Sequence, residues 1–180
     1  MSPETWNSAW HAGQLMELPA ELIEHYPEVP RGFLTRFDFP RTAEFGIYRF
    51  NFGPMLSPFE SLGENEYDDM ADRLMIGELD IDGGMSFVVA ISQTSGQISL
   101  VDFDYDMPEA YVNSDLAAFG LSLRAVVMRY TAIKGGAERS ENFADEIASE
   151  LLNVDPNALD NEVCFWFGVV EFERFRNASA

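Results

Sequence analysis

The sequence predicts an α+β fold in which a central, mostly antiparallel meander sheet is flanked by N- and C-terminal helices. Two observations support this prediction: three strand patterns follow one another closely in the middle of the chain, and helical patterns occupy both ends. The 180 residues contain no internal repeat, low-complexity tract or linker, and this length suits one domain. We therefore expect residues 1–180 to form a single domain.

The strand patterns occupy the most acidic part of the chain. They lie in Leu74–Leu79, Met85–Ile91 and Gln97–Phe103. Asp82–Gly84 supplies a turn before the second strand, and Ser92–Gly96 supplies a hairpin loop after it. Because these connections are too short for crossovers, we expect an antiparallel meander.

Three short helical patterns and one more strand pattern are predicted upstream of the meander. The first helix carries Trp6 and Trp10 on one face, the second covers Leu18–Tyr26, and the third contains residues 33–37. In Phe45–Phe52, aromatic residues alternate with other residues, which predicts a single half-buried strand.

The clearest helical pattern follows the meander. Asn113 or Ser114 is expected to cap this helix, and Asp115 suits the positive end of its dipole. A second helix is predicted over roughly Asn142–Leu152, whereas Val163–Phe175 fits a strand and a helix equally well. The buried stripe of the first helix is predicted to be Leu116, Phe119, Leu123, Val126, Val127 and Tyr130.

Acidic residues dominate the charge of the chain. Thirty-one Asp and Glu side chains stand against eleven Lys and Arg, giving a formal net charge of −20 at pH 7. Nucleic acids and anionic membranes are themselves polyanions, so this charge argues against both as partners and favours a basic protein surface. Solubility alone is the alternative explanation of such a charge.

The acidic excess is concentrated in residues 61–110, where the sequence has twelve acidic side chains and one basic side chain. Residues 63–72 are predicted to form an acidic surface loop. Residues 102–106 alternate aspartate with aromatic side chains, so a strand end there would place the aspartates on one face. Protection of a sheet edge from aggregation would explain the same aspartates. The candidate contacts with a basic partner are Glu64, Glu66, Asp68, Asp69, Asp102, Asp104 and Asp106.

Motifs for catalysis, metal binding or cofactor binding are not found in the sequence. His11 and His25 belong to no ligand pattern. Asp102–Asp106 resembles the start of a calcium loop, but Met107 and Asn113 stand where that loop needs glycine and glutamate. We therefore expect a non-enzymatic protein without a metal or cofactor. A hydrolase that uses a carboxylate pair stays open as a third alternative, because nothing in the spacing selects a pair.

The sequence indicates a cytoplasmic location. The N-terminus lacks a basic segment followed by an apolar one, and no apolar run approaches the roughly 20 residues of a membrane helix. Cys164, the sole cysteine of the sequence, lies in an apolar stretch and has no disulfide partner.

Three stretches resemble the fourth subfamily of the SUKH superfamily of bacterial immunity proteins. They occur in the order of the family pattern and together cover about residues 30–170. The most specific of them is a V-N-S-x-L-x-x-F run within residues 111–119. One stretch departs from the pattern, with Asp38-Phe39 in place of Gly-Leu. The stretches are Phe33–Pro40; then Leu74–Gly77, Gly84, Ser95–Ile98 and Tyr111–Phe119; and finally Asp155–Leu159 with Trp166.

The resemblance implies an α+β, SUKH-like fold and neutralisation of a cognate toxin by direct binding, with no cofactor and no catalytic residues. Superfamily members oppose diverse toxins of polymorphic toxin systems, many of them acting on nucleic acids. Such toxins tend to be basic because they hold a polyanion, so an acidic antidote suits them. A regulatory or scaffolding SUKH module is the second alternative.

Overall fold

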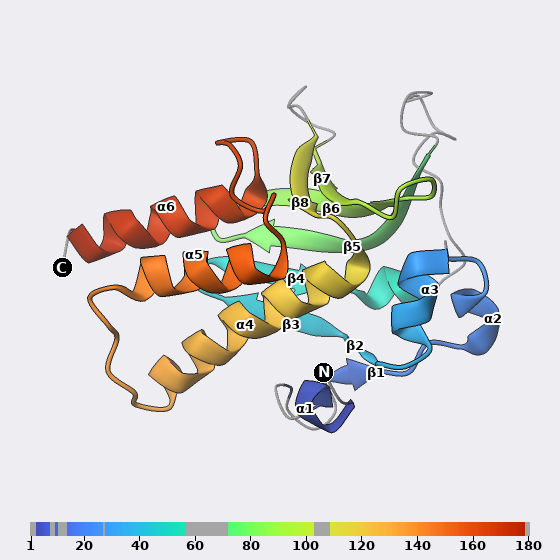
Figure 1. The fold of residues 1–180 in the computed structure, drawn as a ribbon, viewed down its shortest axis with the longest axis horizontal. Helices are drawn as coiled ribbons and strands as arrows, with labels where there is room; N and C mark the ends of the chain where they lie inside the picture. Colours follow the sequence, from blue (N-terminus) through green and yellow to red (C-terminus); the bar gives the residue numbers. More distant parts are fainter. Residues whose placement is uncertain are drawn as a thin grey trace.

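Six strands form one antiparallel sheet in the part of the chain that the structure describes, with the spatial order β3-β4-β5-β6-β7-β8 (Figure 1). The computed structural model describes residues 3–7, 10, 14–26, 28–56, 72–102 and 109–178. Each strand pairs with the next one in sequence, so the sheet is a meander, as predicted. The strands are β3 (Thr42–Phe45), β4 (Tyr48–Asn51), β5 (Arg73–Ile81), β6 (Met85–Ser92), β7 (Ile98–Val101) and β8 (Ala110–Asn113).

The three central strands confirm the predicted meander, with β5, β6 and β7 on the expected segments. Residues 103–108, into which the third predicted strand would extend, lie outside the described residues. Strand β8 was not predicted from the sequence, which indicated only that Asn113 or Ser114 caps the following helix. The small separate pair of strands β1 (Leu15–Met16) and β2 (Phe39–Pro40) was not predicted either.

The prediction of one strand over Phe45–Phe52 is wrong, because β3 and β4 form a hairpin. The chain reverses at Gly46, whose φ of 55° favours glycine. A Cβ at this position would also lie 3.1 Å from the Tyr130 hydroxyl oxygen. Phe45 and Tyr48 are paired across the hairpin with their rings 5.3 Å apart. The aromatic pattern therefore continues through the turn and conceals it.

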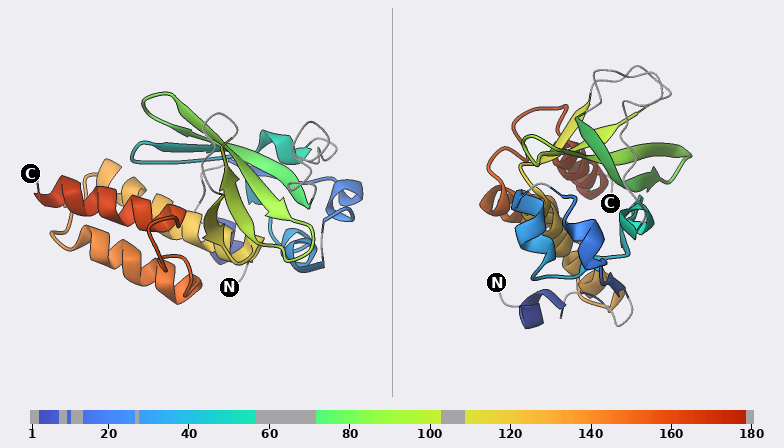
Figure 2. Two further views of the ribbon diagram at one scale, coloured as in Figure 1. Left: turned by 90° about the horizontal axis from the view of Figure 1, so that it is seen from above. Right: turned by 90° about the vertical axis from the view of Figure 1, so that its right-hand side faces the viewer.

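Three long helices cover one face of the sheet: α4 (Leu116–Lys134), α5 (Phe143–Val154) and α6 (Phe165–Ala178). Figures 1 and 2 show all three on the same side, with the opposite sheet face turned away from them. The first two confirm the predicted helices. The third settles the ambiguous C-terminal segment as a helix, because its residues at spacings of three and four are buried together. These residues are Trp166, Val169, Val170 and Glu173.

The cap of α4 differs from the predicted one. The N-cap is Asp115 instead of Asn113 or Ser114. The Asp115 side chain accepts a hydrogen bond of 2.8 Å from the Ala118 amide. Asn113 instead ends β8 and is fully buried. The predicted stripe of α4 is confirmed, because all six of its residues are buried.

The N-terminal elements pack against α4 and the end of the sheet (Figure 1). They are α1 (Pro3–Asn7), α2 (Ala20–Ile23), α3 (Glu28–Leu34) and, after the hairpin, the 3-10 turn η1 (Gly53–Leu56). Trp6 and Trp10 are buried together with their rings 5.7 Å apart, although Trp10 lies beyond the end of α1. Gly120 allows Trp6 to approach α4, because a Cβ there would lie 2.9 Å from the indole ring.

Helix α4 is the one described helix that is long and apolar enough to span a bilayer by length and composition alone. Its sheet-facing stripe lies in the core, against β3, β8, α3 and α5. The role of a core helix in a globular domain accounts for its apolar sequence.

Candidate protein-binding surface

Figure 2 shows that the three long helices leave one face of the sheet uncovered. Two exposed residues of this face, Glu78 and Asp80, form an acidic strip. On β5, Glu78 and Asp80 are exposed on this face, while Leu79 between them is fully buried in the core. This alternation follows from the strand period of two. Pairing then places Val88 of β6 beside Glu78, and Ser86 of β6 beside Asp80.

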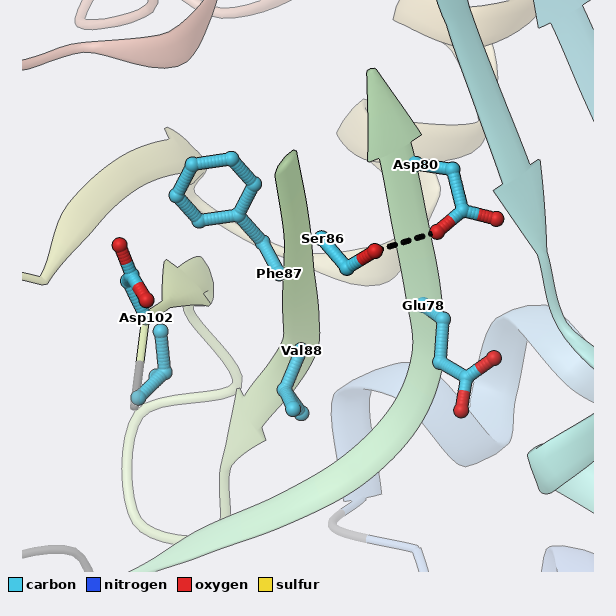
Figure 3. Close-up of a pocket in the computed structure, with 7 residues that line it drawn as sticks. Glu78, Asp80, Ser86, Phe87, Val88 and Asp102 are labelled. Carbon is cyan, nitrogen blue, oxygen red and sulfur yellow. Dashed lines mark hydrogen bonds between the residues drawn. The ribbon is translucent and has the colours of Figure 1, made fainter. Parts of the chain in front are cut away.

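A groove of about 350 Å³ runs across β5, β6 and β7 on this face. Figure 3 shows Glu78 and Asp80 on one side of it and Asp102 on the other. Ser86 lies between the strands, and its Oγ donates a 2.7 Å hydrogen bond to Asp80 Oδ1. The apolar lining comes from Phe87, Val88 and Val101. The groove therefore combines an aliphatic surface with carboxylates on both sides.

Of the predicted contact residues, the structure places Asp102 in this groove. It directly follows β7, and the pairing of Val88 with Val101 brings it across from β5. Glu64, Glu66, Asp68 and Asp69 lie in residues 57–71, and Asp104 and Asp106 lie in residues 103–108, all outside the described residues.

Glu78 and Asp80 belong to the acidic segment of the sequence but are not among the predicted contacts. Their alternation with buried Leu79 was the signal that could have identified them. The pairing of β6 with β7, which brings Asp102 toward them, could not be deduced from that alternation.

In the part of this face that the structure describes, carboxylates outnumber basic side chains. One basic residue, Arg49, lies directly opposite Asp80 across β4 and β5. It also lies 3.8 Å from Glu44, and both of these side chains are more than half exposed. A surface pair of this kind contributes little energy, and one arginine does not offset the surrounding carboxylates.

A second group of carboxylates, at the other end of β5, is engaged within the protein. Burial opposes ionisation of Asp72, but hydrogen bonds from Ser92 and Thr94 and the charge of Arg73 outweigh it and lower the pKa of the Asp72 carboxyl. Burial likewise opposes ionisation of Glu109, and its hydrogen bonds with Arg73 and Ser99 lower its pKa. These carboxylates hold the ends of strands together, in contrast to exposed Glu78 and Asp80.

Comparison with protein families decides the assignment of the chain. The family model of the SUKH-4 immunity proteins matches residues 2–172. The chain belongs to the SUKH-4 immunity protein family. No curated protein and no solved structure shows a significant match to it. The match confirms the resemblance and extends it to the N-terminal helices of this SUKH-4 protein.

Two of the stretches that resemble the family, Tyr111–Phe119 and Asp155–Leu159 with Trp166, meet in a largely buried hydrogen-bond network. Asn113 accepts a 2.9 Å hydrogen bond from Trp166 Nε1 and donates to Asp155 and Ser122. Asp155 also accepts bonds of 2.8 Å from the Tyr111 hydroxyl and 2.7 Å from the Ser114 amide. The network joins β8, the start of α4, the α5–α6 connection and α6. These residues of the SUKH-4 protein therefore hold β8 against the helices.

Burial works against ionisation of Asp155, which is 2% exposed. The hydrogen bonds that its carboxylate accepts, from the Ser114 amide first and the Tyr111 hydroxyl second, outweigh burial and lower its pKa. The charged form of Asp155 is thus stabilised by surrounding donors inside the domain.

Residues with catalytic potential are scattered in the SUKH-4 structure. Within the described ranges, no three His, Cys, Asp or Glu side chains are grouped to hold a metal ion. His25 is exposed just after α2, with Nδ1 2.6 Å from the Glu21 carbonyl oxygen. Cys164 is buried, and its Sγ lies 3.7 Å from the Asn157 carbonyl oxygen. His11 lies outside the described residues.

Proposed function

We propose that this SUKH-4 protein neutralises a cognate toxin by direct binding, and that the acidic outer face of its sheet contacts a basic surface of that toxin. The family match over residues 2–172 is the observation that supports immunity most strongly. The net charge of −20 and the acidic groove support the electrostatic part of the proposal.

The groove suits long basic side chains. A lysine or arginine has an aliphatic stem that can lie on Val88 and Val101, while its cationic head reaches a carboxylate. Such a cationic head could pair with Glu78 or Asp80 on one side of the groove, or with Asp102 on the other side. The acidic segments 57–71 and 103–108 add further carboxylates to the net negative charge of the chain.

A toxin that acts on nucleic acid is the class that best fits this surface. Its active face must carry lysine and arginine to hold phosphates, and an acidic protein competes for that face. The immunity protein then acts stoichiometrically in the cytoplasm, without a cofactor and without turnover. Zinc or calcium retained in stoichiometric amounts after dialysis would contradict this non-enzymatic mode of action.

Co-expression tests the proposal directly. The toxin domain encoded next to the gene for this protein should arrest growth when expressed alone and should be harmless when co-expressed with the immunity protein. Purified together, the two chains should migrate as one complex. Protection without a complex would contradict neutralisation by binding and would favour a regulatory or catalytic role.

A further inference from the structure

Arg49 has two carboxylates within reach on the outer face of the sheet. Strand pairing places it directly opposite Glu44 of β3 on one side and directly opposite Asp80 of β5 on the other. Side chains that are directly opposite each other in neighbouring antiparallel strands project from the same face and can interact. All three side chains are exposed, so the long stem of Arg49 can turn its guanidinium toward either carboxylate.

In the structure, the guanidinium of Arg49 lies with Glu44. The distance between Arg49 Nη2 and Glu44 Oε1 is 3.8 Å, and among the described residues Arg49 forms an ion pair with Glu44 and not with Asp80. Asp80 instead accepts a 2.7 Å hydrogen bond from Ser86 Oγ through Oδ1. Figure 3 shows the other carboxylate oxygen of Asp80 pointing away from Ser86. The present position of Arg49 therefore leaves the charge of Asp80 unneutralised beside the groove.

The two positions of Arg49 differ little in energy. An exposed ion pair contributes little, and Glu44 and Asp80 offer the same kind of acceptor. Removal of the Glu44 charge should therefore shift the guanidinium toward Asp80, the remaining carboxylate directly opposite it. In that position Arg49 neutralises Asp80 and competes with any cationic side chain that approaches the groove.

We propose that Glu44 is a positioning residue of the toxin-binding surface, which holds Arg49 away from Asp80 and so keeps the Asp80 carboxylate open to a cationic side chain of the toxin. The inference rests on the proposed function, because it requires Asp80 to contact the toxin. It gives a role in recognition to β3 and β4, two strands outside the residues that line the groove.

The alternative is that Glu44 acts only through its own charge, as one more carboxylate on an acidic face. Its effect on association is then independent of Arg49. Glu44 and Asp80 are separated by two strand spacings, or about 10 Å. At about 0.15 M salt the Debye length is about 8 Å, so the direct action of Glu44 at Asp80 is largely screened.

A double-mutant cycle on Glu44 and Arg49 separates the two explanations. The association rate of the toxin domain encoded next to the gene is measured by stopped-flow fluorescence at about 0.15 M salt. Glu44→Gln should slow association roughly threefold, because Arg49 then neutralises Asp80. Arg49→Gln should speed association, because it removes the competing cation. In the Arg49→Gln background, Glu44→Gln should change the rate by less than about 1.5-fold.

Glu78→Gln is the matched control. It removes the same charge from the same face, but Asn51 and not Arg49 lies directly opposite Glu78. The slowing that it causes should be the same with and without Arg49. Equal slowing by Glu44→Gln in both backgrounds would overturn the inference, because it would show that Glu44 acts only through its own charge. A rate that Arg49→Gln leaves unchanged or lowers would also overturn it.

Failure of this inference can be distinguished from failure of the proposed function. If Glu78→Gln slows association and the effects of Glu44→Gln and Arg49→Gln are additive, the acidic face still recognises the toxin and the role of Glu44 alone is wrong. If neither Glu78→Gln nor Asp80→Asn changes the association rate, recognition through this face is wrong, and the role of Glu44 is wrong with it.

Discussion

Trp166 Nε1 donates a 2.9 Å hydrogen bond to Asn113 Oδ1, joining α6 to the end of β8 across 53 residues of sequence. Both side chains are fully buried, so neither group can turn to water when its partner is removed. Asn113 simultaneously donates to Asp155 and Ser122. The amide of one asparagine therefore fixes three other segments relative to one another.

Asn113→Ala should lower the free energy of unfolding by about 2 to 4 kcal/mol, because it leaves the Trp166 indole N–H and the Asp155 carboxylate short of partners in the interior. Urea unfolding monitored by circular dichroism measures this loss. Asn153→Ala, at an exposed position of α5, is the matched control and should change the free energy by less than about 0.5 kcal/mol. Equal effects of the two substitutions would show that the network contributes no stability.

The start of α4 provides a second test. Asp115→Ala should cost about 1 kcal/mol of stability, because it removes the acceptor for the Ala118 amide. Ser114→Ala should cost less, since the Ser114 backbone amide, which bonds to Asp155, is retained. Phe119→Ala should cost about 3 to 5 kcal/mol, because the ring is fully buried. Thermal melting of the three variants gives the order, and a larger loss for Ser114→Ala than for Asp115→Ala would refute the cap.

The depressed pKa of Asp155 predicts a pH dependence of stability. A carboxyl whose folded pKa lies below its usual 3.8 stabilises the fold above that value, and this contribution disappears as the pH falls through the folded pKa. Asp155→Asn should therefore be less stable than wild type at pH 7, and the difference should shrink below about pH 4. Urea unfolding of both proteins from pH 7 to pH 3 measures this difference. A difference that stays constant over the range would contradict the assignment.

The elements that the sequence predicted correctly are those whose pattern lies within one short stretch of chain. The meander strands have short turns between apolar runs, and α5 has a clean helical period. The C-terminal segment did not reveal its structure because Phe, Trp and Val suit both a strand and a helix. Packing decides it: the face with Trp166 and Glu173 contacts β8, α5 and Tyr130, all distant in sequence.

The features that were missed depend on contacts between distant segments. In the sequence, Asp155 is noted only as part of a stretch that resembles the family, whereas the structure shows that it accepts a hydrogen bond from Tyr111, 44 residues away. Glu78 and Asp80 could be placed on the outer face from their alternation, but their proximity to Asp102 depends on the register of β6 and β7. The acidic composition thus predicted the character of the candidate surface, and strand pairing determined which side chains share it.

The association rate between this SUKH-4 protein and its toxin tests the central claim most directly. Wild type should bind the toxin domain faster than the usual 10⁵–10⁷ M⁻¹s⁻¹ at about 0.05 M salt, and the rate should fall steeply at about 0.5 M. The variant Glu78→Gln, Asp80→Asn, Asp102→Asn should associate roughly tenfold more slowly at low salt and lose most of that salt dependence.

The matched control removes three exposed charges outside the sheet, as Glu138→Gln, Glu141→Gln and Glu162→Gln, and should associate at nearly the wild-type rate. Stopped-flow fluorescence at the two salt concentrations measures all three proteins. A steep salt dependence that the groove variant loses and the control retains is the predicted result. Rates that are independent of salt, or equal losses in variant and control, would contradict recognition of the toxin by the acidic face of the sheet.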